Sequence, residues 1–181
     1  MTPTALLVPT YRNMLRMLLG LLRTLEDQAP ARAQALLGAR LAPDMYPLAT
    51  QVRYAALQAQ EALYRLRGEP RPDALTALGE EARAAADNPG TLAQARARIE
   101  EALAALDTLS PCALDTSGET PVAIELPGDL AFDMSGAHYV RDWALPQFYF
   151  HVVTAYAILR AEGIAIGKAN FVPHMFAYKR P

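Results

Sequence analysis

The polar side chains best suited to chemistry lie on the most hydrophobic stretch of the chain, between Ser135 and Gly167. Gln147 and His151 are four residues apart and Thr154 follows three residues later, so a helix places all three on one face. A buried polar group without a partner costs about 1–3 kcal/mol, so each of these groups needs one. The spacing therefore indicates either a core histidine with internal hydrogen bonds or a ligand or general base between helices.

The stretch that carries these residues is expected to form one long buried helix. Ser135 can cap its first turn, and Gly163 can adopt the left-handed conformation that ends helices. Apolar residues occupy almost every face, but polar residues interrupt every window of about 20 residues, which argues against a membrane span. Pro146 lacks a backbone donor and should bend the helix close to Gln147.

Composition favours one globular domain, spanning residues 1–181. Hydrophobic residues make up 52% of the chain and charged residues 20%. The net charge of −2 argues against nucleic acid as a partner, because that function needs a basic surface. The single cysteine, Cys112, excludes an intramolecular disulfide and a cysteine-based zinc cluster. Arg16 interrupts the apolar run near the N-terminus, so we expect no secretory signal and a cytoplasmic protein.

Three further long helices are indicated by the pattern of apolar residues. The first lies between about Thr4 and Asp27, with its regular part starting near Pro9. Its apolar arc is wide enough to suggest homodimerisation through this helix; it contains Leu7, Tyr11, Met14, Leu15, Leu18, Leu19, Leu21, Leu22 and Leu25.

The second helix is expected to begin at Asp44 or Met45, with Pro47 in its first turn and a possible ion pair between Arg40 and Asp44. Residues 73–86 are expected to form a helical turn or two. The third long helix starts after Thr91, which forms a capping box with Gln94.

Residues 121–134 have a different pattern. Apolar residues alternate with polar ones on both sides of Pro127-Gly128-Asp129, which predicts a β-hairpin packed by one face onto the helices. The hairpin leads directly into the stretch that contains His151. The sequence alone thus predicts an all-α bundle with one small hairpin before its last long helix.

Two segments resemble a family of bacterial proteins known as a domain of unknown function. They are ARLAPDMYPLATQV, from Ala39 to Val52, and ALPQFYFHVVTAYAILRAEGIAIGK, from Ala144 to Lys168. The family is placed in the DinB/YfiT-like superfamily, and the resemblance runs from Leu7 to about Phe171. It implies a DinB-like four-helix bundle with a long crossover connection, and it assigns no activity.

The wider superfamily contains metal-dependent enzymes with three histidine ligands, and the resemblance implies where these would lie. Relative to the Leu159-Arg160 pair, His151 falls on the last of the three histidines. Gln147 falls on the position four residues earlier, and Gln51 is the counterpart on the second helix. One imidazole and two neutral amides form a poor shell for zinc or nickel. Asp44 is the nearby carboxylate that would complete a metal site.

These residues lead to three alternative functions. The first is a small-molecule-binding bundle, with no cofactor and a polar pocket made by Gln51, Gln147, His151 and Thr154 and walled by Trp143, Tyr149 or Phe150. The second is a hydrolase or thiol-dependent transferase that uses a divalent transition metal bound by His151 and Asp44. The third is a structural or homodimeric protein in which the polar face sets helix packing.

Overall fold

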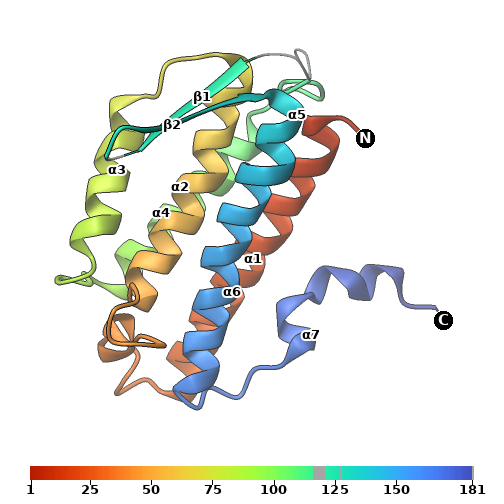
Figure 1. The fold of residues 1–181 in the computed structure, drawn as a ribbon. Coiled ribbons are helices and arrows are strands. Elements are labelled where there is room, and N and C mark those ends of the chain that lie inside the picture. The colour runs from red at the N-terminus through yellow and green to blue at the C-terminus, as the bar shows by residue number, and fades with distance from the viewer. Residues whose placement is uncertain (116–120, 127, 181) are drawn as a thin grey trace.

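Four long helices form the bundle, as the computed structural model shows for residues 1–115, 121–126 and 128–180 (Figure 1). They are α1 (Pro3–Gln28), α2 (Leu48–Arg67), α4 (Leu92–Asp107) and α6 (Leu145–Ala161). A shorter helix, α3 (Asp73–Ala84), packs on the outside of α2. Because α2 contacts α1, α3, α4 and α6, it is the helix around which the others are arranged.

The wide apolar arc of α1 is buried inside the bundle. All nine residues of the arc named above have exposed fractions of 8% or less. The arc is therefore covered by other helices of the same chain, and it leaves no apolar face of α1 for a second copy. Pro9 lies inside α1 and not in its first turn, so the prediction that regular helix starts at Pro9 was wrong. Thr2 caps the helix instead, by accepting a hydrogen bond from the Ala5 amide.

The connection between α1 and α2 contains the 3₁₀-helix η1 (Ala35–Gly38) and an extended loop. α2 begins at Leu48, three residues later than Met45, because Pro47 is extended and precedes the helix. The predicted ion pair between Arg40 and Asp44 does not form. The Arg40 guanidinium instead donates to the carbonyl oxygens of Met45 and Ala86, which ties the loop to the end of α3.

The local signals around α4 and the hairpin were interpreted correctly. The Thr91 hydroxyl oxygen accepts from the Gln94 amide at 3.1 Å, and the Gln94 side-chain oxygen accepts from the Thr91 amide at 2.8 Å, as in a capping box. Strands β1 (Pro121–Leu126) and β2 (Leu130–Ser135) pair antiparallel, with Ile124 opposite Phe132. Ile124 is buried against the bundle, whereas Phe132 remains 39% exposed.

The long helix expected after Ser135 is divided by a π-helical segment. Ser135 does cap its first turn, and Gly163 has the expected positive φ of 82° after its end. Between these residues the chain forms α5 (Gly136–His138), the π-helix η2 (Tyr139–Ala144) and then α6. Pro146 lies in the first turn of α6, where a missing N–H costs little, and the widened turn precedes it. The chain ends in α7 (Lys168–Phe171) and the 3₁₀-helix η3 (Pro173–Tyr178).

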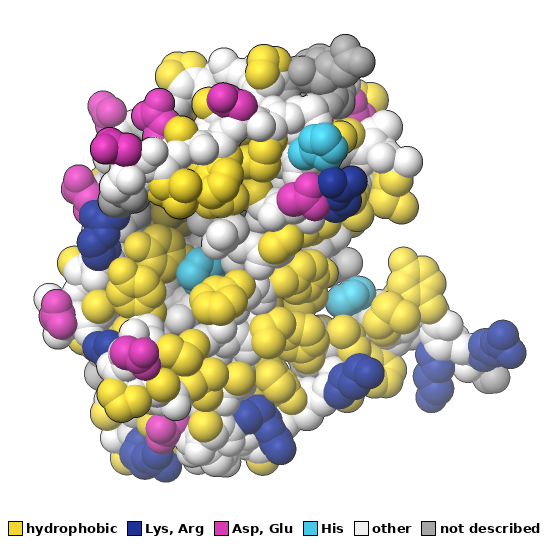
Figure 2. Space-filling model, viewed as in Figure 1, with side chains coloured by type: hydrophobic (Ala, Val, Ile, Leu, Met, Phe, Trp, Pro, Cys, Tyr) yellow, Lys and Arg dark blue, Asp and Glu magenta, His cyan; other side chains and the backbone are white. Residues whose placement is uncertain are grey.

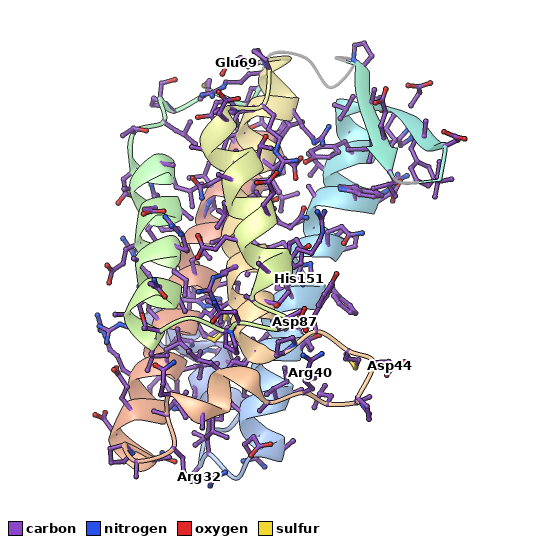
Figure 3. The ribbon with its side chains drawn as sticks, turned by 90° about the vertical axis from the view of Figure 1, so that its left-hand side faces the viewer. Arg32, Arg40, Asp44, Glu69, Asp87 and His151 are labelled. Carbon is purple, nitrogen blue, oxygen red and sulfur yellow. The ribbon has the colours of Figure 1, made fainter. Side chains whose placement is uncertain are left out.

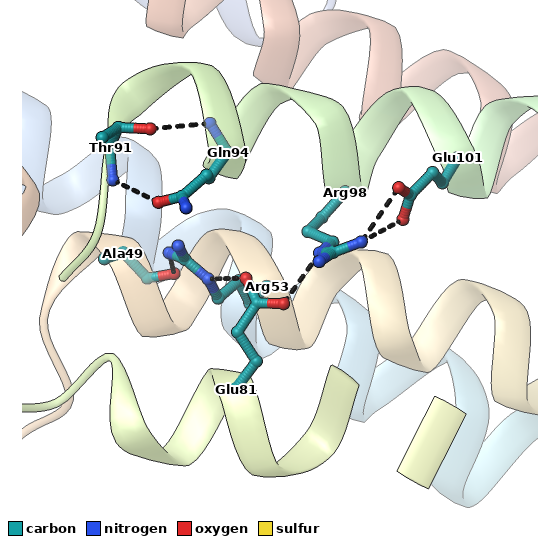
Figure 4. Close-up of polar contacts among 7 residues, drawn as sticks. All are labelled: Ala49, Arg53, Glu81, Thr91, Gln94, Arg98 and Glu101. Carbon is teal, nitrogen blue, oxygen red and sulfur yellow. Dashed lines mark hydrogen bonds and ion pairs between the residues drawn. The ribbon is translucent and has the colours of Figure 1, made fainter. Parts of the chain in front are cut away.

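A chain of ion pairs joins α2, α3 and α4 on the side of α2 away from α6 (Figure 4). Arg53 is only 2% exposed, and its Nε donates to Glu81 Oε1 at 2.7 Å while its Nη1 donates to the Ala49 carbonyl at 3.1 Å. The other Glu81 oxygen accepts from Arg98 Nε at 2.8 Å, and Arg98 also pairs with Glu101. Glu81 is therefore the carboxylate that compensates a buried guanidinium.

This arrangement predicts different costs for two similar substitutions. Glu81→Gln leaves the Arg53 charge buried without its counter-ion and should lower the free energy of unfolding by about 3 kcal/mol. Glu101→Gln removes an exposed partner of Arg98 and should cost less than about 1 kcal/mol. Urea unfolding of both variants measures the difference, and equal costs would contradict the role given to Glu81.

Candidate functional site

His151 lies on α6 with its imidazole turned toward α2, where it meets Gln51. The distance from His151 Nδ1 to Gln51 Oε1 is 2.8 Å, and both side chains are buried. The Gln51 amide nitrogen donates to the Tyr46 carbonyl at 3.1 Å, so the amide oxygen is the atom that faces the imidazole. Because an amide oxygen only accepts, Nδ1 carries the proton and Nε2 keeps a free lone pair.

Two aromatic rings contact the imidazole. Tyr54, from α2, stacks on His151 with 5.0 Å between ring centroids and 22° between planes. Phe150 meets the imidazole edge-on at 5.4 Å, and Tyr46 packs against Tyr54 at 5.8 Å. Tyr46 and Phe150 are 42% and 56% exposed, so they form an aromatic rim around a largely buried histidine. Figure 2 shows a histidine ring recessed in a hollow among hydrophobic side chains.

Burial lowers the pKa of His151 from 6.5 to about 4, because the low-dielectric surroundings disfavour the imidazolium ion. The ring is therefore neutral at physiological pH. Nε2 has no hydrogen-bond partner among the residues that the structure describes. Nor is this atom completely buried. It therefore remains accessible as an acceptor or as a base.

The structure does not bring the other expected pocket residues to the imidazole. Thr154 is buried, but its hydroxyl donates to the Phe150 carbonyl within the same helix. Gln147 is half-buried and makes no side-chain hydrogen bond within the described part of the chain. Trp143 packs against Phe132 of the hairpin, with 5.8 Å between the two rings. Of the expected set, Gln51 forms a hydrogen bond with His151 and Phe150 contacts its ring edge-on.

The residues present do not fit a transition-metal site. Asp44 is exposed at the tip of the loop before α2, well away from His151 (Figure 3). The Gln51 oxygen is already used by the imidazole Nδ1. Within residues 1–115, 121–126 and 128–180, no group of three or more His, Cys, Asp or Glu side chains is placed to hold a metal ion. A single imidazole nitrogen is a poor first shell for zinc or nickel.

Sequence reasoning missed the two tyrosines of the site. Tyr54 is three residues after Gln51, and this helical spacing alone would have placed it on the same face of α2. Tyr46 gave no such signal, because its backbone carbonyl orients the Gln51 amide and that contact depends on how the loop folds back.

Comparisons with known proteins agree with this fold. Residues 4–172 match the family model described as "Domain of unknown function (DUF1993)". The chain is also similar to the crystal structure of a DinB family member protein from Shewanella denitrificans, with 29% sequence identity and a TM-score of 0.79 over 98% of this chain and 95% of that one. No protein of curated function matches the sequence. None of the helices in the described ranges is long and apolar enough to cross a membrane.

The lowered pKa of His151 predicts a specific loss of stability in acid. The unfolded chain binds a proton at this histidine near pH 6.5, and the folded chain does so only near pH 4. The unfolded chain therefore gains a proton that the folded chain excludes as the pH falls from 6.5 to 4. Over this range the free energy of unfolding should decrease by about 3 kcal/mol, and above pH 6.5 this histidine should cause no loss.

Urea unfolding at a series of pH values measures this loss against His151→Gln, which cannot titrate. The wild-type free energy of unfolding should fall more steeply than that of the variant between pH 6.5 and 4. The control variant is His138→Gln, which makes the same substitution at an exposed histidine. Parallel curves for wild type and His151→Gln would show that the folded state does not hold this imidazole neutral.

Proposed function

The chain belongs to the DUF1993 family, within the DinB-like helical bundles, and from this premise we propose that it binds an uncharged small molecule at His151. One observation carries the proposal: the imidazole Nδ1 is fixed by Gln51, while Nε2 retains a free lone pair beneath exposed aromatic rings. A core histidine that served packing alone would be expected to use both nitrogens.

The site's chemistry limits the class of ligand. A neutral Nε2 accepts a hydrogen bond, so it recognises an N–H or O–H group and repels a carboxylate. The rings of Tyr46 and Phe150 offer flat apolar surface to a planar molecule. The ligand that fits best is therefore an uncharged aromatic or heteroaromatic compound with one hydrogen-bond donor, such as an indole, a phenol or a purine base.

The position of Gln51 adds selectivity for the neutral imidazole. Its amide oxygen stabilises the proton on Nδ1 without the negative charge that a carboxylate would supply. A carboxylate partner would favour the imidazolium ion and remove the acceptor at Nε2. The pair therefore maintains one tautomer and one charge state, which suits recognition of a donor group.

A fragment screen observed through the imidazole of His151 tests this function. Phenols, indoles and purines should shift the His151 nitrogen resonances, and the effect should be larger at Nε2 than at Nδ1. His151→Gln should weaken binding at least about 10-fold, because one well-oriented hydrogen bond is lost. Tyr64→Phe, on α2 beyond the site, should bind like wild type. A screen in which no compound shifts these resonances would contradict the proposal.

A metal-dependent hydrolase or transferase is the second candidate, and one observation favours it. Histidines that bind metals usually donate their other N–H to an oxygen atom, as His151 does to Gln51. Since the remaining donors are missing, we expect weak binding at most.

Elemental analysis of protein purified without a histidine tag tests this candidate, before and after soaking with zinc, nickel or manganese. We expect much less than one equivalent of metal per chain, because a single imidazole does not hold these ions against dialysis. Full occupancy that disappears in His151→Ala, and persists in His138→Ala, would instead support the enzyme.

A further inference from the structure

The end of the chain forms an apolar arm whose first part, α7, packs against α1 and whose second part, η3, stands away from the bundle (Figure 1). This C-terminal arm consists of residues 168–180 and includes α7 and η3, neither of which contains a buried residue. Met175, Phe176 and Tyr178 are 52%, 61% and 78% exposed. Large apolar side chains are normally buried, because burying apolar surface stabilises a protein by about 25 cal/mol per Å².

A second unpartnered apolar surface lies on α6. Tyr149, Phe150 and Val153 form this outer strip, and 36–56% of each side chain is exposed. The strip leads into a groove of about 290 Å³ lined by Val153, Tyr156, Lys168 and Phe171, at the root of the arm. The arm itself bounds a further apolar groove of about 450 Å³. In Figure 2 hydrophobic side chains line both sides of the open space between the bundle and the arm.

We propose that two copies of this chain pair about a two-fold axis, with the arm of each packed on the outer strip of the other. The strip lies in the first half of α6, whereas the arm follows the end of α6. Pairing α6 antiparallel with its symmetry mate therefore brings each arm beside the partner's strip. A two-fold axis covers both surfaces in both copies, as an isologous interface requires.

The exposed aromatic area supplies a large part of such an interface. A fully covered aromatic side chain buries about 150–250 Å², so the four exposed aromatic residues of the strip and the arm supply roughly 450 Å² per copy. A stable interface buries about 800 Å² per partner, so these rings alone supply more than half. Tyrosine and phenylalanine are also among the residues enriched in such interfaces.

Charge supports the antiparallel arrangement. The arm ends in Lys179 and Arg180 and contains no acidic residue. In an antiparallel pair this basic end lies toward the hairpin that precedes the partner's α6. Three hairpin carboxylates, Glu125, Asp129 and Asp133, are exposed and have no ion-pair partner within the described ranges. The two charged surfaces are thus complementary.

The molar mass of the full chain, measured by sedimentation equilibrium over a range of concentrations, tests the dimer. The wild type should be dimeric at high micromolar concentration. Phe176→Asp or Val153→Asp should weaken the dimer on the order of 100-fold, since each change occurs twice in the interface. Leu41→Asp is the matched control, because Leu41 is also an exposed apolar residue but lies in the loop before α2.

Circular dichroism of each variant shows whether it remains folded. A wild-type chain that stays monomeric, or a Phe176→Asp variant that dimerises like wild type, overturns the proposal. If the wild-type monomer instead binds vesicles or an unrelated protein through the arm, the second copy is also excluded. Because Phe150 belongs both to this strip and to the rim of the His151 site, the mass is measured without added ligand, and its result then tests the dimer by itself.

A charge exchange tests the antiparallel arrangement by itself. Replacing Lys179 and Arg180 by glutamate should weaken the dimer, and the remaining association should become tighter as salt is added, because salt screens the repulsion between like charges. Adding Asp129→Lys and Asp133→Lys to the same chain should restore it. Contact between the arm and the hairpin would be ruled out if the first pair of substitutions left the dimer dissociation constant unchanged. It would also be ruled out if the second pair failed to restore that constant.

Discussion

The hydrogen bond between Gln51 and His151 is the contact on which the chemistry of this bundle depends. It links α2 to α6, and it determines which imidazole nitrogen carries the proton. Burial then keeps the ring uncharged. If the amide were turned around, its NH₂ group would donate to Nδ1 and the imidazole proton would lie on Nε2. The Tyr46 carbonyl that orients the amide therefore contributes indirectly to the choice of tautomer. The loop before α2, the Gln51 side chain and the imidazole therefore determine the tautomer together.

α2 carries two buried polar side chains on opposite sides of the same turn. Gln51 points toward α6 and is satisfied by neutral partners, whereas Arg53 points toward α3 and α4 and is satisfied by a carboxylate and a carbonyl. Both side chains are almost completely buried. Each direction therefore has its own requirement for partners, and this requirement specifies which helix lies on which side of α2. Apolar packing alone would specify the neighbours of α2 less well, because many of its buried side chains are alanines and present the same small surface on each side.

Features encoded by neighbouring residues could be predicted from the sequence. The Ser135 cap, the capping box at Thr91, the hairpin and the positive φ at Gly163 depend on contacts within a few residues, and all four are present. Prolines were less informative, because Pro9, Pro47 and Pro146 each permit more than one local solution and the surrounding packing selects among them. In the site, the sequence pointed to Gln51 and His151 together. It did not reveal Tyr46, whose role requires a loop to fold back onto α2, and it did not place Asp44.

The π-helical turn at residues 139–144 has a consequence for how relatives of this chain are compared. Such a turn accommodates one more residue than an α-helix of the same height. If a related protein lacks that residue, everything before it rotates by about 100° relative to α6, because each α-helical residue contributes that angle. The hairpin and Trp143 would then face a different side, while His151, further along, would stay in place. In an alignment of relatives, a one-residue gap in this short region therefore indicates a different arrangement of the hairpin around the histidine, even where the histidine itself is shared.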